Sequence, residues 1–376
     1  MSAEPWGEVT ALLDGAVRAG LFAGCALCVT TREGEALAVQ RGQAELRPRA
    51  RALRPDHPFD VASLTKVLCT TPLALALADA GRLDLDGPAA DWLPGADPRI
   101  TARALLHHGS GLPAWNRIYA EVEETGLAWG SPAARAFAMR AAWTTPLEAE
   151  PMARHRYSDL GFLTLGALLE AAGGDRIDRL WERHVRRPAG VDLRWGWPDA
   201  AATEDCPVRG RVVVGEVHDL NAATMGGIAP HAGLFGSARA VAALAGWQLA
   251  AWQGQLVGGP SPERMRAAWS AEGPGSHRLG WDGVTAGASS AGPRWPLDGV
   301  GHLGFTGCSV WVAPRQGVVV AFLSNRVHPE IEGGAVPDAP EAARYAAFRR
   351  LRPALHTAIV DALDGLGCWD PDAPAP

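Results

Sequence analysis

A serine and a lysine in the segment 59–66 have a spacing that could support nucleophilic catalysis. Ser63 and Lys66 are three residues apart, so at the start of a helix their side chains share one face and can meet. A serine hydroxyl is a weak nucleophile until a base takes its proton. A neutral Lys66 amine could be that base, if burial and a second cation lower its pKa.

Lys66 is also the only lysine among 35 basic residues. Arginine stays protonated in proteins, whereas lysine can be made neutral by its surroundings. The lone lysine is therefore a candidate for proton chemistry. Chance survival in an arginine-rich composition explains the count equally well, so the count alone does not decide between the two interpretations.

A second candidate group is Tyr157-Ser158-Asp159, which directly precedes a helical pattern. A tyrosine close to two cations can lose its proton below the usual pKa of about 10 and act as a base or an acid. The alternative is that Tyr157 is a half-buried aromatic residue. We expect Asp159 to cap the following helix in either case.

A third candidate group is the glycine-rich segment 301–307, which leads into a predicted strand. Glycines such as Gly304 allow a ligand to approach the backbone closely. His302 could orient a substrate carboxyl group or hold a proton, or it could be an ordinary polar loop residue. Some tryptophans in loop-like segments are expected to line a wide apolar cleft, although most should pack in the core: Trp115, Trp195, Trp197, Trp281 and Trp295.

The elements that must position these residues follow from hydrophobic periodicity. We expect helices over residues 8–19, 63–80, 160–172, 176–187, 238–252 and 339–364, with a kink or break at Pro72. Two hairpins are predicted, one from residues 22–31 and 35–41 and one from residues 308–313 and 317–324. Strands at both ends of the chain around a helical middle favour an α/β domain that is split by a helical insertion.

Composition excludes several classes of protein. The net charge is −6, which disfavours a nucleic-acid partner. The apolar share of 47% fits a globular chain, and no uncharged apolar stretch is long enough to suggest a membrane span. The N-terminal residues lack the pattern of a secretory signal. We therefore expect a cytoplasmic protein.

The cysteines give no sign of a metal or redox site. Cys25 and Cys28 lie on a predicted strand, where residues three apart face opposite sides. We expect free thiols, no metal and no cofactor.

Taken in order, the motifs resemble those of the serine hydrolases of the class C β-lactamase and penicillin-binding-protein type, including their esterase relatives. Ser63-Leu64-Thr65-Lys66 matches the first family motif. Tyr157-Ser158-Asp159 is similar to a Tyr-x-Asn motif, and His302-Leu303-Gly304 is similar to a Lys-Thr-Gly motif. The resemblance spans roughly residues 8–350 and extends to segments 81–86, 105–113 and 227–235.

The resemblance implies an α+β fold of the β-lactamase/transpeptidase type, with an antiparallel sheet flanked by helices and an inserted, mostly helical domain. We expect residues 1–62 and 231–376 to form the α/β domain. Residues 63–230 would form the helical domain, with the nucleophile helix at the interface.

The resemblance also implies roles for individual residues. Ser63 would be the acyl-forming nucleophile, and Lys66 and Tyr157 would share general acid and base duty. The backbone N–H groups of Ser63 and Phe305 would form the oxyanion hole. Asp159, His302, Gly304 and Trp115 are the expected substrate-binding residues.

Three departures from the family pattern bear on the substrate. Asp159 places a negative charge where an amide is usual, Leu303 removes a hydroxyl group, and His302 is a weaker carboxylate anchor than lysine at pH 7. Together they favour a neutral ester or amide substrate. The expected activity is that of an esterase-type serine hydrolase that works through an acyl-enzyme on a small molecule.

The alternatives within the same chemistry are a D-amino-acid peptidase or amidase, a β-lactamase and an acyltransferase. A non-catalytic ligand-binding protein that keeps the fold is the alternative of another class. The oligomeric state is left open.

Overall fold

The computed structural model describes residues 5–256, 259–329 and 339–374. Its centre is a seven-stranded antiparallel sheet in the order β3-β2-β1-β12-β11-β10-β9. The strands are β1 (Gly24–Thr31), β2 (Gly34–Glu45), β3 (Arg51–Ala52), β9 (Asp282–Gly283), β10 (Val300–Leu303), β11 (Ser309–Ala313) and β12 (Val318–Ser324). Both predicted hairpins are confirmed, as β1–β2 and β11–β12.

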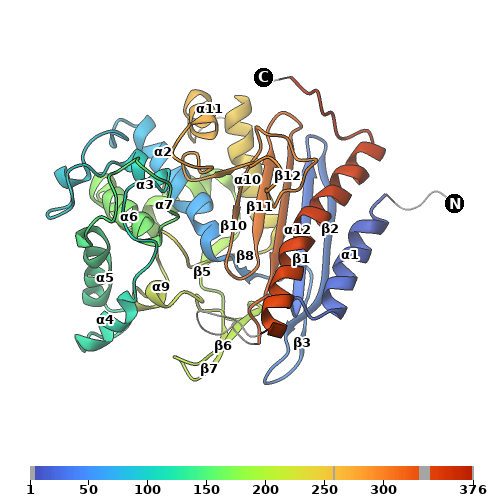
Figure 1. Cartoon of the computed structure of the whole chain (residues 1–376), viewed down its shortest axis with the longest axis horizontal. Coiled ribbons are helices and arrows are strands. Elements are labelled where there is room, and N and C mark those ends of the chain that lie inside the picture. The colour runs from blue at the N-terminus through green and yellow to red at the C-terminus, as the bar shows by residue number, and fades with distance from the viewer. Residues whose placement is uncertain (1–4, 257–258, 330–338, 375–376) are drawn as a thin grey trace.

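Helices cover both faces of this sheet (Figure 1). Helices α1 (Gly7–Arg18) and α12 (Ala339–Gly365) pack on one face, and α10 (Ala238–Gln253) packs on the other. A hydrophobic core lies between the sheet and the helices on each face. Alternation along β1 places Cys25 in the core under α1 and α12 and Cys28 in the core under α10. The prediction that these two cysteines face opposite sides is therefore confirmed, and both thiols are free.

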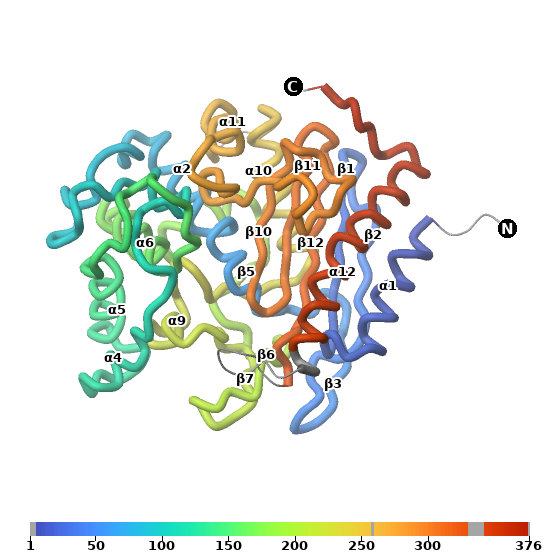
Figure 2. Tube along the Cα trace, viewed as in Figure 1, coloured from blue at the N-terminus to red at the C-terminus, as the bar shows by residue number. Residues whose placement is uncertain are grey.

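Most remaining helices lie beside the sheet, between β4 (Phe59–Asp60) and β8 (Leu234–Gly236) along the chain (Figure 2). They are α2 (Thr71–Asp79), α3 (Ala102–Leu106), α4 (Ile118–Glu124), α5 (Pro132–Thr144), α6 (Asp159–Gly173), α7 (Ile177–Trp181), α8 (Arg187–Ala189) and α9 (Leu220–Thr224). Helix α11 (Pro262–Ser270) follows α10. One continuous core joins α6 to the sheet, with Leu165 and Val310 among its members.

Several short strands were not predicted. The strands β4, β8 and β5 (Leu193–Trp195) form a small sheet, and β6 (Ala202–Cys206) pairs with β7 (Arg211–Val214). These runs have at most five residues, which is too short for a clear alternating pattern. No helix within the described ranges is both long and apolar enough to cross a membrane.

The helix predicted over residues 63–80, with a kink or break at Pro72, is interrupted directly before that proline. The segment consists of a 3₁₀ turn (Ala62–Leu64), a π-helical turn (Lys66–Thr70) and then α2. Pro72 has no N–H to donate to the carbonyl of Leu68, and the Nε1–H of Trp181 donates to that carbonyl instead, at 3.0 Å. The amide of Gln248 likewise donates to the Val67 carbonyl.

The helix predicted over residues 176–187 is interrupted in the same way. A π-helical turn (Glu182–Arg186) separates α7 from α8, and Pro188 lies in the first turn of α8. In both places a proline follows the π-helical turn, which indicates a common local cause.

Candidate active site

Ser63 lies on the tight turn that connects β4 to the π-helical segment. The preceding residue, Ala62, has a φ of 47°, a conformation that non-glycine residues rarely adopt. The buried carboxylate of Asp60 accepts a hydrogen bond from the Ala62 N–H at 2.8 Å and another from the His218 N–H at 2.7 Å. Burial raises the pKa of Asp60 to about 6. The turn has an unfavourable φ at Ala62 and is held by hydrogen bonds to Asp60. It leaves Ser63 half-buried, with access to solvent.

Lys66 is completely buried directly beneath this turn. Its Nζ donates to Ser63 Oγ at 3.0 Å, to Asp159 Oδ1 at 2.7 Å and to the His231 carbonyl at 3.3 Å. All three partners accept hydrogen bonds, and one of them is a carboxylate. The surroundings therefore suit a protonated ammonium group.

The prediction of a neutral Lys66 in the resting site is wrong. Burial by itself would lower the pKa of Lys66, but the nearby Asp159 and Tyr157 outweigh burial and raise it above its ordinary value. The expected lowering of the pKa required a second cation beside Lys66, but the neighbour at 2.7 Å is the Asp159 carboxylate, which has the opposite charge. The resting site therefore holds a charged lysine, and one proton must leave before a base becomes available.

Tyr157 lies two residues before α6, with the Lys66 Nζ 4.9 Å from the centre of its ring. Its hydroxyl interacts with both Lys66 and Ser63, and each of them acts to lower its pKa. Burial raises the pKa of Tyr157, and the single cation of Lys66 does not reverse that shift. The expectation of a tyrosine acidified by two cations is therefore wrong, and Tyr157 is a neutral phenol at rest.

The expected cap of α6 is also corrected. Ser158 is the cap, because its Oγ accepts the Gly161 N–H at 2.9 Å. Asp159 is the first residue of the helix, and its carboxylate turns toward Lys66 instead.

The end of β10 closes one side of the site. A Cβ on Gly304 would lie 2.7 Å from the Val61 carbonyl, so only glycine lets the strand approach the Ser63 turn this closely. His302 is buried, and its Nδ1 lies 2.8 Å from the Leu303 carbonyl. Burial, His277 and Lys66 hold the pKa of His302 well below its usual range. The imidazole is therefore neutral at pH 7.

The side chain of Phe305 is exposed and stacks on His218, with ring centres 5.0 Å apart. His218 Nδ1 lies 2.7 Å from the buried Glu204 carboxylate. Burial acts to lower the pKa of His218, but Glu204 and the other nearby carboxylates raise it. An imidazole that is paired with a buried carboxylate thus supports the aromatic ring beside the nucleophile.

Ser63, Asp159 and Phe305 line two cavities at once. The first has a volume of about 660 Å³ and a partly apolar wall that includes Trp115, Tyr119 and Leu220. The second has a volume of about 550 Å³ and includes Tyr157, His302 and Gly304. The nucleophile candidate therefore lies between two spaces, which could take the two halves of an ester or amide.

Of the loop tryptophans considered from the sequence, Trp115 lines the first cavity and is 43% exposed. Trp281 and Trp295 instead belong to the two cores, with exposures of 0% and 3%. Loop position alone could not distinguish these cases, because burial depends on which neighbours fold over each ring.

Sequence reasoning missed several residues that line the two cavities. His218, Asp219 and Glu204 face the first, and His277, Arg326 and Arg352 face the second. They come from segments distant in the chain, so spacing gave no signal. His231 lies in a segment that the family resemblance covers, but its carbonyl contact with Lys66 was not foreseen.

Two groups of described residues bring three potential metal ligands within 4.8 Å of one another. In one group, Asp159 binds Lys66, and Asp219 binds His231 Nε2 at 2.9 Å. These side chains already satisfy each other. The other group consists of His108, His277 and His302.

Comparisons with known proteins identify the family of the chain. Residues 9–343 match the family model described as Beta-lactamase. A putative D-alanyl-D-alanine carboxypeptidase of Escherichia coli (strain K12) is 28% identical over 313 residues, which cover 73% of this chain and 70% of the relative. An N-acetylmuramyl-L-alanine amidase of Bacillus subtilis (strain 168) is 27% identical over 322 residues, covering 77% and 72%.

Among solved structures, the chain is similar to EstCE1, described as a hydrolase with promiscuous acyltransferase activity. The TM-score is 0.72 at 20% identity, with 94% of this chain and 98% of the other covered. At this identity the likeness speaks for the fold alone. The expected α+β fold of the β-lactamase/transpeptidase type is confirmed.

Proposed function

Since this chain belongs to the beta-lactamase family of serine hydrolases, we propose that it is an esterase-type member that forms an acyl-enzyme on Ser63. One observation carries the proposal: Ser63 Oγ lies 3.0 Å from Lys66 Nζ, and Ser63 borders two cavities, the second of which Tyr157 also lines. A nucleophile in contact with a potential base and facing substrate-sized space is the arrangement that acyl transfer needs.

In the proposed reaction, Ser63 Oγ attacks the substrate carbonyl and its proton passes to the Lys66–Tyr157 pair. At rest Lys66 is an ammonium group and Tyr157 a neutral phenol, so one of the two must lose a proton before the pair can accept the proton of Ser63. Because the pKa values of both residues are raised, the form that has lost this proton is scarce at pH 7 and increases with pH. Tyr157 then protonates the leaving group.

The negative charge that develops on the substrate oxygen would be stabilised by the backbone N–H groups of Ser63 and Phe305. Each such donor is worth about 3–4 kcal/mol in other serine hydrolases. Both residues border the two cavities, which supports this placement.

A neutral ester or amide is the proposed substrate class. His302 is neutral, and Leu303 offers no hydroxyl group to a carboxylate. Trp115 and Phe305, which are exposed on the wall of the first cavity, favour an apolar acyl group.

A D-amino-acid peptidase or amidase is the second candidate. Two arginines, Arg326 and Arg352, line the second cavity, where they could attract a substrate carboxylate. The named relatives, a carboxypeptidase and an amidase, point the same way.

The test is a panel of p-nitrophenyl esters, D-amino-acid amides and nitrocefin, assayed with the wild type and with Ser63→Ala. We expect turnover of esters above the other classes, and loss of all turnover in Ser63→Ala. Preference for the amides would favour the second candidate. Unchanged ester turnover by Ser63→Ala would refute the nucleophile assignment.

A cytoplasmic location is likewise proposed. It is supported by the six cysteines, all of which are free, because thiols persist in a reducing compartment.

A further inference from the structure

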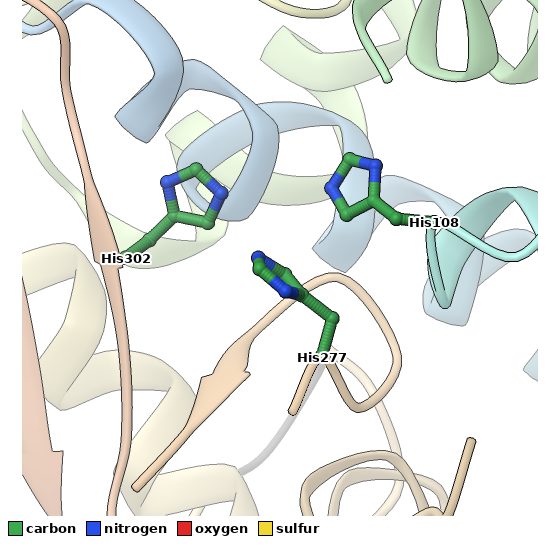
Figure 3. A group of neighbouring side chains, drawn as sticks. All are labelled: His108, His277 and His302. Atoms are coloured by element: carbon green, nitrogen blue, oxygen red, sulfur yellow. The ribbon is translucent and has the colours of Figure 1, made fainter. Parts of the chain in front are cut away.

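Three buried histidines face one another beside the second cavity. Figure 3 shows the imidazole rings of His108, His277 and His302 turned toward a common point from separate segments of the chain. Their exposures are 1%, 8% and 2%, and one nitrogen of each lies within 4.8 Å of the others. The acylation chemistry proposed above uses none of these nitrogens.

Hydrogen bonds determine where two of these rings carry their proton. His108 Nδ1 accepts the Ser158 N–H at 3.0 Å, so a neutral His108 must carry its proton on Nε2. His302 Nδ1 faces the Leu303 carbonyl at 2.8 Å, and a carbonyl can only accept. His302 therefore carries its proton on Nδ1 and has a lone pair on Nε2. Both Nε2 atoms are buried without a partner among the described residues.

The third ring is oriented by two neighbours. His277 Nδ1 lies 3.0 Å from His155 Nε2 and 3.7 Å from the Asp282 carboxylate. We assign the proton of the contact with His155 to His277 Nδ1, because the Asp282 carboxylate lies on the same side of the ring, and this leaves Nε2 with a lone pair. Burial, with the ammonium of Lys66 nearby, holds the pKa of all three histidines below the usual range, so all three are neutral at pH 7.

A metal ion does not suit this group. It would need a lone pair from each ring, but the Ser158 N–H keeps the His108 proton on Nε2. The ammonium of Lys66 also acts on all three rings, which makes the position unfavourable for a cation.

The three rings therefore offer one N–H, from His108 Nε2, and two lone pairs, on the Nε2 atoms of His277 and His302. A water molecule can hydrogen-bond to all three. It can accept from His108 and donate to His277 and His302, which gives the three hydrogen bonds that are typical of a buried water. His277 and His302 line the same cavity of about 550 Å³ as Ser63. When a leaving group departs through that cavity, water takes its place.

We propose that His108, His277 and His302 hold the water that hydrolyses the acyl-enzyme, and that His302 accepts its proton. This inference rests on the proposed function, because it concerns the second half of the same reaction. It makes His302 a catalytic residue, with His108 and His277 as positioning residues. It also favours hydrolysis over transfer to another acceptor.

The step balances as follows. The water oxygen bonds to the acyl carbon while its proton passes to His302 Nε2. On collapse of the tetrahedral intermediate, the bond from that carbon to Ser63 Oγ breaks. Because the Lys66–Tyr157 pair has already given a proton to the leaving group, His302 passes its proton to the pair as the pair protonates Oγ. The carboxylic acid product leaves, and His302 is neutral again while the pair is short of one proton, as it was before acylation.

The test is His302→Gln with p-nitrophenyl acetate, followed by rapid mixing and intact-protein mass measurement. Glutamine keeps an acceptor oxygen but is no base. We expect a first turnover of p-nitrophenol close to one per enzyme, a steady-state rate about 100-fold lower, and an accumulated acetyl adduct on Ser63. Hydroxylamine, a nucleophile that needs no base, should restore the steady-state rate.

The matched control is His356→Gln, since His356 is another buried neutral histidine, packed on Trp295 outside both cavities. It should behave as the wild type. If His302→Gln does not fold, His277→Gln tests the same water and should also accumulate the adduct.

Two failures can be distinguished. If Ser63→Ala releases p-nitrophenol as fast as the wild type, the proposed function fails. If release depends on Ser63 but His302→Gln turns over at the wild-type rate, or loses acylation and deacylation equally, only the water site is overturned.

Discussion

The charge on Lys66 determines when the candidate site can react. The proximity of Ser63 and Lys66 follows from their spacing of three residues, so the sequence was sufficient to predict it. The charge does not follow from that motif, because the carboxylate of Asp159 and the carbonyl of His231 reach Lys66 from distant segments. A local motif can thus predict which groups meet, but not their protonation.

Asp159→Asn tests this electrostatic account. Without the carboxylate, burial should dominate and lower the pKa of Lys66. We expect the rising limb of kcat/KM against pH to move to lower pH by about 1–3 pH units, since an opposite charge at this range has an effect of that size.

The comparison variant is Asp192→Asn, at an exposed pair with Arg194 outside the two cavities. Its pH profile should match that of the wild type. An unmoved limb in Asp159→Asn would show that Asp159 does not control the protonation of Lys66.

At the scale of elements, two close approaches of β10 position the site. Gly304 lets the strand end meet the Ser63 turn, and Gly301 packs directly on the indole of Trp311 in β11. The strand was not predicted at residues 300–303, because its glycines and short length hide the alternating pattern. The two long hairpins and helices α1, α6, α10 and α12 were predicted to within a few residues, because each has enough turns or alternations to show its period. Helix α5 was not predicted, although it has 13 residues.

Gly301→Ala should damage both stability and activity. A Cβ at this position would overlap the buried indole of Trp311, and overpacking of this kind costs about 1–3 kcal/mol. The free energy of unfolding from a denaturant titration measures the loss.

Gly246→Ala is the matched change in an open position. Gly246 lies within α10 and has no neighbour close to an added Cβ. This variant should gain about 0.5–1 kcal/mol, because alanine is the better helix former. Equal effects of the two substitutions would contradict the packing account.

Across the described part of the molecule, several histidines are buried and neutral. Burial lowers the pKa of His57 and His328 to about 4 and the pKa of His277 and His356 to about 3. Composition shows 11 histidines but not which ones are buried, since burial depends on how distant segments pack. The sheet-and-helix architecture, in contrast, was accessible from the sequence through the order of its elements.

These histidines predict sensitivity to acid. Below pH 6.5 the unfolded chain binds protons that the folded chain excludes, so the free energy of unfolding falls as the pH falls toward the folded pKa values. Each group contributes about 1.4 kcal/mol per pH unit. In His356→Gln, the loss of stability between pH 7 and pH 5 should be smaller by about 2 kcal/mol. Denaturant titrations at the two pH values measure this, and an unchanged loss would contradict it.

The central claim is that Ser63 becomes covalently acylated. The most direct measurement is labelling of the whole protein with an active-site-directed fluorophosphonate, followed by peptide mass mapping. We predict a single adduct on the peptide that contains Ser63, and no adduct in Ser63→Ala. Absence of an adduct on Ser63, or equal labelling of Ser63→Ala, would contradict the account.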